Sequence, residues 1–140
     1  MKKHLLTLAG VLGLLMAAGS AHAQSVNVKA NVPFDFKIVN KLVPAGQYQL
    51  VSNGSLDSDI LRLVNAKGGT LALITTSKDS NAKPADHTVL VFHRYGDNYF
   101  LAGMTSSGQS IRWEFPRGKA EMEVARVSQA SDVLVASTGR

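Results

Sequence analysis

Short apolar runs, separated by glycine, proline or polar residues, recur roughly every 10 residues along most of this chain. The densest run is VLVFHRYGDNYFLAGM, residues 89–104, in which Gly96, Asp97 and Asn98 interrupt two apolar arms. Valine, leucine and aromatic residues favour strands, and the three interrupting residue types favour tight turns. The pattern predicts an antiparallel hairpin of Val89–Tyr95 with Tyr99–Met104. Its inward face stays open, because a loop of two or three residues gives opposite registers.

Other segments alternate between apolar and polar residues, which is typical of half-buried strands. Thr70–Thr76 is partly apolar on both faces, a pattern that favours a central strand. Ser77–Asp86 is polar, and we expect an exposed loop there. The remaining predicted strands are Ser25–Val32, Phe34–Ile38, Gln47–Ser52, Ile60–Asn65 and Ser110–Phe115.

The segment 117–128 fits either a helix or a strand. Ala120, Val124 and Val127 have helical spacing, which favours one short helix. The chain after residue 128 forms either a last strand or a loose tail. With about eight strands and no alternation with long helices, the sequence predicts an all-β fold: a single antiparallel β-sandwich or small barrel with one short C-terminal helix.

The first 23 residues have the order of a secretory signal peptide. Lys2 and Lys3 precede an apolar run from Leu5 to Ala18, and Ala21-His22-Ala23 is a small-x-small cleavage site. The apolar run is short for a membrane span. We therefore expect cleavage after Ala23, export to the periplasm or the extracellular space, and a single β domain over residues 24–140 without a transmembrane segment.

Composition narrows the choice of partners. The chain has no cysteine, so an exported fold would have to rely on its core and its hydrogen bonds. Loss of Lys2 and Lys3 from the 15 basic residues leaves 13 against 10 acidic ones, a net charge of +3. Because these charges are scattered along the chain, we expect no nucleic-acid partner.

Chemistry-bearing motifs are absent from the sequence. His87 and His93 have no metal-ligand spacing, and no serine stands in a nucleophile motif. We expect no catalytic residue, no metal site and no cofactor, and we interpret His93 as a cross-strand hydrogen-bonding group. A small hydrolase that uses His93 with Asp97 or Asp35 remains an alternative.

All nine aromatic residues fall in predicted strands or at strand ends, so most should pack in the core. Tyr95, Tyr99 and Trp113 are the candidates for a ligand site, because amphipathic aromatic side chains suit a half-wet surface. The leading hypothesis is a non-enzymatic binding or envelope-associated module for a glycan, a lipid or a protein. A structural protein that self-associates through its strands is a second hypothesis.

Four segments resemble a group of short exported proteins from acidobacterial genomes that has no assigned function. The segments are VPFDF at Val32–Phe36, LVPAGQY at Leu42–Tyr48, VFHRYGDNYFL at Val91–Leu101 and EFPRGKAEMEVA at Glu114–Ala125. The resemblance runs from about Asn31 to Ala125 and implies export and a single β domain. It supplies no catalytic residue, ligand or partner.

Overall fold

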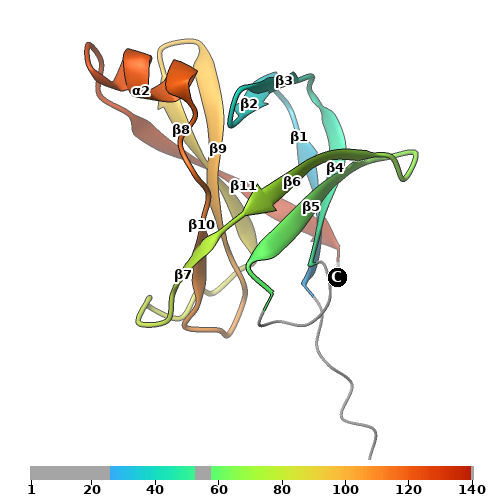
Figure 1. Ribbon diagram of the computed structural model, residues 1–140. Helices are drawn as coiled ribbons and strands as arrows, with labels where there is room; N and C mark the ends of the chain where they lie inside the picture. Colours follow the sequence, from blue (N-terminus) through green and yellow to red (C-terminus); the bar gives the residue numbers. More distant parts are fainter. Residues whose placement is uncertain (1–25, 53–57, 140) are drawn as a thin grey trace, which may run out of the picture.

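The computed structural model describes residues 26–52 and 58–139. The predicted signal peptide and its cleavage site lie outside the described residues. Strands and one short helix account for most of the described chain (Figure 1). Their bounds are β1 (Asn27–Val32), β2 (Phe36–Ile38), β3 (Lys41–Val43), β4 (Gly46–Ser52), β5 (Ile60–Asn65), β6 (Thr70–Thr75), β7 (Ser77–Asp79), β8 (Val89–Tyr95), β9 (Asn98–Thr105), β10 (Arg112–Glu114), α2 (Lys119–Ala125) and β11 (Ser131–Gly139).

The strands form one curled mixed sheet with the shape of a half-barrel (Figure 1). The main path has the order β3-β2-β9-β8-β11-β1-β4-β5-β6, and β10 pairs with both β9 and β7. The pairs are antiparallel except β2 with β9, where Lys37 lies opposite Phe100 in a parallel pair. The predicted all-β class with one short helix is confirmed, and the sheet is mixed where an antiparallel one was expected.

The core fills the concave side of this sheet. Alternate residues of β1, β4 and β5 point inward because side chains of a strand alternate between its faces. Three aromatic side chains, Phe36, Phe92 and Trp113, are at most 1 % exposed and are among the largest buried groups. Phe36 and Phe92 meet edge-on, with ring centroids 5.2 Å apart. Burial of these rings contributes much of the hydrophobic stabilisation.

The predicted hairpin is present as β8 and β9. Tyr95 lies opposite Asn98, so the loop has two residues, Gly96 and Asp97. Gly96 has a φ of 61°, a left-handed conformation that glycine adopts without a Cβ penalty. A bulge after Val91 shifts the register once along the hairpin.

Three segments differ from the expectations. β6 lies at one end of the sheet, not at its centre, and its Leu73 is 65 % exposed. Part of the expected loop 77–86 forms β7, which pairs with β10. The segment after residue 128 is a strand, β11, that lies between β8 and β1.

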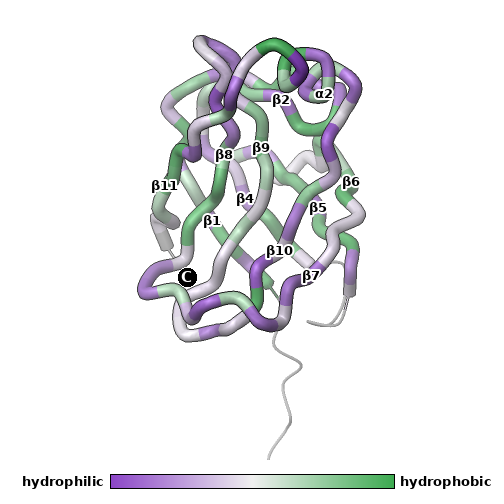
Figure 2. The backbone as a smooth tube through the Cα atoms, turned by 90° about the vertical axis from the view of Figure 1, so that its left-hand side faces the viewer, coloured by the Kyte–Doolittle hydropathy of each residue, from purple (hydrophilic) through white to green (hydrophobic). Residues whose placement is uncertain are grey.

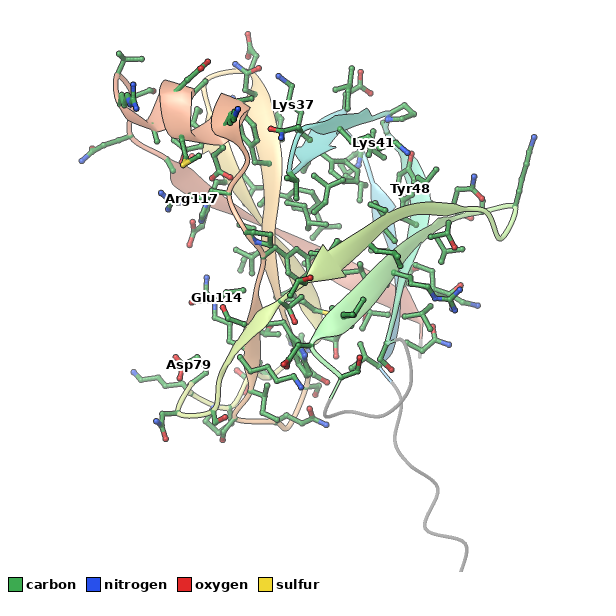
Figure 3. All side chains as sticks on the ribbon, in the orientation of Figure 1. Lys37, Lys41, Tyr48, Asp79, Glu114 and Arg117 are labelled. Atoms are coloured by element: carbon green, nitrogen blue, oxygen red, sulfur yellow. The ribbon has the colours of Figure 1, made fainter. Side chains whose placement is uncertain are left out.

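The two ends of the sheet approach each other without pairing as strands. Lys41 of β3 donates from Nζ to the carbonyl oxygen of Leu71 in β6 at 2.7 Å. Figure 3 shows Lys41 between these two strands. Leu42 of β3 is 63 % exposed, close to the value for Leu73. Two free strand edges with apolar side chains therefore border this seam.

Candidate functional site

The convex side of β8 and β9 carries a second, smaller set of buried apolar side chains. Val91, Tyr95, Phe100 and Ala102 are each at most 9 % exposed, yet they do not belong to the main core cluster. The rings of Tyr95 and Phe100 meet with centroids 5.7 Å apart. Helix α2 lies beside the upper part of this hairpin (Figure 1). Side chains on this face are thus covered near the hairpin turn.

One buried carboxylate attaches α2 to the hairpin. Glu121 is 3 % exposed, and its Oε1 lies 2.6 Å from Nδ1 of His93. The hydroxyl of Tyr95 donates to the same oxygen at 3.2 Å, and Nε of Arg117 lies 3.8 Å away. A buried charge costs free energy unless it is paired and hydrogen-bonded, and these groups supply that compensation.

Burial raises the pKa of Tyr95, and the negative charge of Glu121 raises it further, while Arg117 partly opposes the rise. The hydrogen bond to Glu121 acts in the same direction as burial, because the phenol must keep its proton to donate it. Tyr95 is therefore held as a neutral donor to the buried carboxylate.

The turn between β2 and β3 fixes the start of α2. The side-chain oxygen Oδ1 of Asn40 accepts from the backbone N–H of Lys119 at 3.1 Å. A Cβ at Gly118 would lie 2.2 Å from the carbonyl oxygen of Val39, so only glycine allows this approach. Residues nearly 80 positions apart in sequence thus position the segment that carries Glu121.

The same face also holds an open hollow of about 300 Å³, farther from α2. We call this hollow the outer groove. Figure 2 views the molecule from its left-hand side in Figure 1, and stretches of β8 and β9 are hydrophobic there. Val89, Val91 and Leu134 give the groove apolar walls. The other lining residues are the loop residues 85–87 together with Thr105, Arg112 and Asp132.

The register of four strands explains this set of lining residues. Val91 lies opposite Leu134 of β11, and Val89 lies opposite Thr105 of β9, which in turn faces Arg112 of β10. Residues directly opposite in antiparallel strands share a face. Arg112 therefore lies on the face opposite its buried neighbour Trp113.

Hydrogen bonds hold the loop that borders the groove. The backbone N–H of Gly108 donates to the carbonyl oxygen of Ala85 at 2.9 Å. Ser107 donates from its backbone to Oγ1 of Thr88 at 3.0 Å and from its hydroxyl to the carbonyl oxygen of Asp86 at 3.1 Å. The border of the groove is thus built by contacts between segments about 20 residues apart.

Arg112 is half-buried at one end of the groove, and its Nε is buried without a hydrogen-bond partner. Within residues 26–52 and 58–139 no carboxylate forms an ion pair with its guanidinium, although Asp79 lies directly opposite in β7. The hydroxyl of Thr105 is also buried without a partner. Among the described residues, neither Nε of Arg112 nor the hydroxyl of Thr105 has an acceptor.

The three aromatic residues predicted as a ligand site do not share one surface. Trp113 is 1 % exposed and belongs to the main core. Tyr99 is half-buried and stacks on Phe34, with ring centroids 3.8 Å apart. Tyr95 is buried and bonds Glu121. Each of these side chains is engaged in a separate contact.

His93 lies next to different carboxylates from those expected. Its Nδ1 contacts Glu121, and its Nε2 lies 3.9 Å from Oδ1 of Asp132 across the β8–β11 pair. Asp35 instead accepts from the backbone N–H of Ala45 at 2.8 Å. His87, the other histidine of the described ranges, lines the outer groove. The hydrolase hypothesis therefore lacks its expected carboxylate partners, since His93 bonds α2.

A second hollow, of about 380 Å³, is mostly polar and is lined by residues of β1, β4 and β11 and the β5–β6 turn. Its amides are partly engaged within the protein. Nε2 of Gln49 donates to Oδ1 of Asn27, and Oδ1 of Asn65 accepts from the backbone of Gly69. The ring of Tyr48 is 8 % exposed, and its hydroxyl donates to the carbonyl oxygen of Pro44. Although it is larger, this hollow has a more polar lining than the outer groove.

Within the described parts of the chain, no group of three or more His, Cys, Asp or Glu side chains could hold a metal ion. None of the helices described there combines the length and the apolar character needed to cross a membrane. Comparison with protein-family models, curated proteins and solved structures finds no match. The resemblance to acidobacterial exported proteins stays a prediction.

Proposed function

We propose that this protein is an exported, non-enzymatic binding module that holds the apolar part of a small amphiphilic ligand in the outer groove. The observation that carries the proposal is the open groove itself, with its apolar walls of Val89, Val91 and Leu134 and its hydrogen-bonded border. Binding sites for small molecules are concave and mostly apolar, with a few placed polar groups. A volume of about 300 Å³ suits one chain of a lipid-like molecule.

Leu134 supports this proposal most directly. It is 62 % exposed beside the buried Val91, so its side chain is free to contact a ligand. A ligand in the groove would remove this leucine from water, and burial of its apolar surface would lower the free energy of the complex.

The test is titration calorimetry with dodecanol below its solubility limit. It uses the mature chain, residues 24–140 as expected after cleavage, and two matched variants. Leu134→Asp should weaken binding by about tenfold or more, because a charge replaces an apolar wall. Leu73→Asp changes an equally exposed leucine on β6 and should leave binding unchanged. Circular dichroism checks that both variants fold. Equal affinity in the two variants, or no binding by the unaltered chain, contradicts the proposal.

A structural protein that self-associates through its strands is the second candidate. The free edges of β3 and β6 favour it, because an unpaired strand can pair with another chain. β6 has the sequence TLALIT, without a charge or a proline to block pairing. Sedimentation velocity of the mature chain at rising concentration discriminates between the candidates. Dimers that Leu73→Lys dissociates would support self-association, and a strict monomer would exclude it.

A further inference from the structure

We infer that the ligand of the outer groove carries a carboxylate, which pairs with Arg112 while its single apolar chain lies along Val89, Val91 and Leu134. This inference rests on the proposed function and adds the chemistry of the ligand's head group. It follows from a charged side chain that the described protein leaves unpaired at one end of an apolar groove.

Partial burial of an arginine without a counter-ion is unfavourable. Removing a charged group from water costs free energy that only a paired opposite charge returns. Asp79 lies directly across from Arg112 and forms no ion pair with it. A carboxylate is the group that a guanidinium binds best, because two N–H donors match its two oxygens.

Asp132 and Arg112, at opposite ends of the groove, set the orientation of the ligand. Asp132 lies on β11, three interstrand spacings from Arg112 on β10, or about 14 Å across the sheet. It also lies close to Nε2 of His93. Asp86, on the bordering loop, lies nearer the Arg112 end, because its carbonyl oxygen accepts from Ser107, two residues after Thr105. Asp132 therefore repels an anionic head group from its own end of the groove, and the guanidinium of Arg112 attracts the head group to the other end.

The walls between these two ends are apolar. Val89 and Val91 of β8 line this interval, and Leu134 lies beyond them on β11. The hydrocarbon chain of a ligand whose head group lies at Arg112 thus crosses β9 and β8 before it reaches Leu134. The arrangement fits a fatty carboxylate better than a sugar, whose hydroxyl groups would face valine and leucine side chains.

Three ligands with the same 12-carbon chain and different head groups test the inference: dodecanoate, dodecanol and dodecylammonium. Calorimetry at about pH 7 keeps the carboxylate and the ammonium ionised. The unaltered protein should bind dodecanoate about tenfold to a hundredfold tighter than dodecanol, the range expected for a charge-assisted hydrogen bond. Dodecylammonium should bind most weakly.

Variants assign the preference to one side chain. Arg112→Gln should reduce dodecanoate binding to the level of dodecanol and leave dodecanol nearly unchanged, whereas Arg112→Lys should keep part of the preference. Arg62→Gln is the matched control, because Arg62 also has a buried Nε without a partner but does not line the groove. It should keep the full preference.

The outcomes separate this inference from the proposed function. Equal binding of dodecanoate and dodecanol, or a preference that persists in Arg112→Gln, overturns the carboxylate assignment and leaves the binding module intact. Failure of all three ligands to bind overturns both.

Discussion

His93 and Glu121, which are 28 residues apart in sequence, meet with Nδ1 and Oε1 at 2.6 Å on the convex face of the sheet. The carboxylate is almost fully buried, whereas the imidazole keeps 17 % of its side-chain surface exposed. This contact attaches a helix of only seven residues, which is too short to be stable alone. The helix therefore depends on this buried acid and on the bond from Lys119 to Asn40 at its start.

Glu121→Ala should lower the free energy of unfolding by about 2 to 3 kcal/mol, because it leaves the donors of His93 and Tyr95 without their acceptor. Urea denaturation followed by circular dichroism measures the change. Glu123→Ala, an exposed glutamate on the same helix, should change the stability by less than about 0.5 kcal/mol. Equal effects of the two substitutions would show that burial of Glu121 has no energetic role.

Tyr95 should make the stability depend on pH in the alkaline range. Its folded pKa is raised above 10.0, so folded and unfolded chains are both protonated well below that value and the full stability is present there. As pH rises through 10.0 the unfolded chain loses its proton first, and the unfolding free energy falls until the folded pKa is passed. Tyr95→Phe should reduce this slope. If the unfolding free energy of the variant falls with pH as steeply as that of the unaltered protein, the pH dependence does not come from Tyr95.

β11 should be required for the fold, because it pairs with β8 on one side and β1 on the other. Proline cannot donate to a strand ladder, so Val135→Pro should cost about 3 kcal/mol or more. Gln129→Pro, outside the strand, should cost much less. Thermal unfolding measures both, and a Val135→Pro variant as stable as its control would exclude a central β11.

Trp113 should report on the core through its fluorescence. It is the single tryptophan of the chain and is 1 % exposed. Its emission should be blue-shifted and resist quenching by acrylamide until the chain unfolds. Red-shifted emission in the native protein would instead support its predicted role at a half-wet ligand surface. Binding of dodecanol to the outer groove should leave this emission nearly unchanged.

Local sequence patterns predicted the hairpin and the helix because their signals lie within each segment. Gly96 and Asp97 separate two apolar arms, and Ala120 and Val124 have helical spacing. The same helical pattern did not indicate which side is covered. Val127 is 88 % exposed, and the charged Glu121 is the buried residue. Its burial depends on His93 and Tyr95, which are distant in sequence.

The order of the strands could not be read from composition. β6 is apolar on both faces, like a central strand, yet among the described strands it pairs only with β5, at one end of the sheet. The parallel pairing of β2 with β9 has no local signal. The outer groove likewise depends on long-range contacts, since Ser107 holds the loop at Asp86 beside it.

The seam at Lys41 and Leu71 has a consequence for the motions of the protein. At this seam the flexible side chain of Lys41 donates a hydrogen bond to the carbonyl oxygen of Leu71. Elsewhere in the sheet, ladders of backbone hydrogen bonds join neighbouring strands. Local opening occurs where cooperative contacts are fewest. In native-state deuterium labelling, the amides of β3 and β6 should exchange before those of β8 and β11. The sheet should therefore open transiently between β3 and β6, while the amides of β8 and β11 stay protected from exchange.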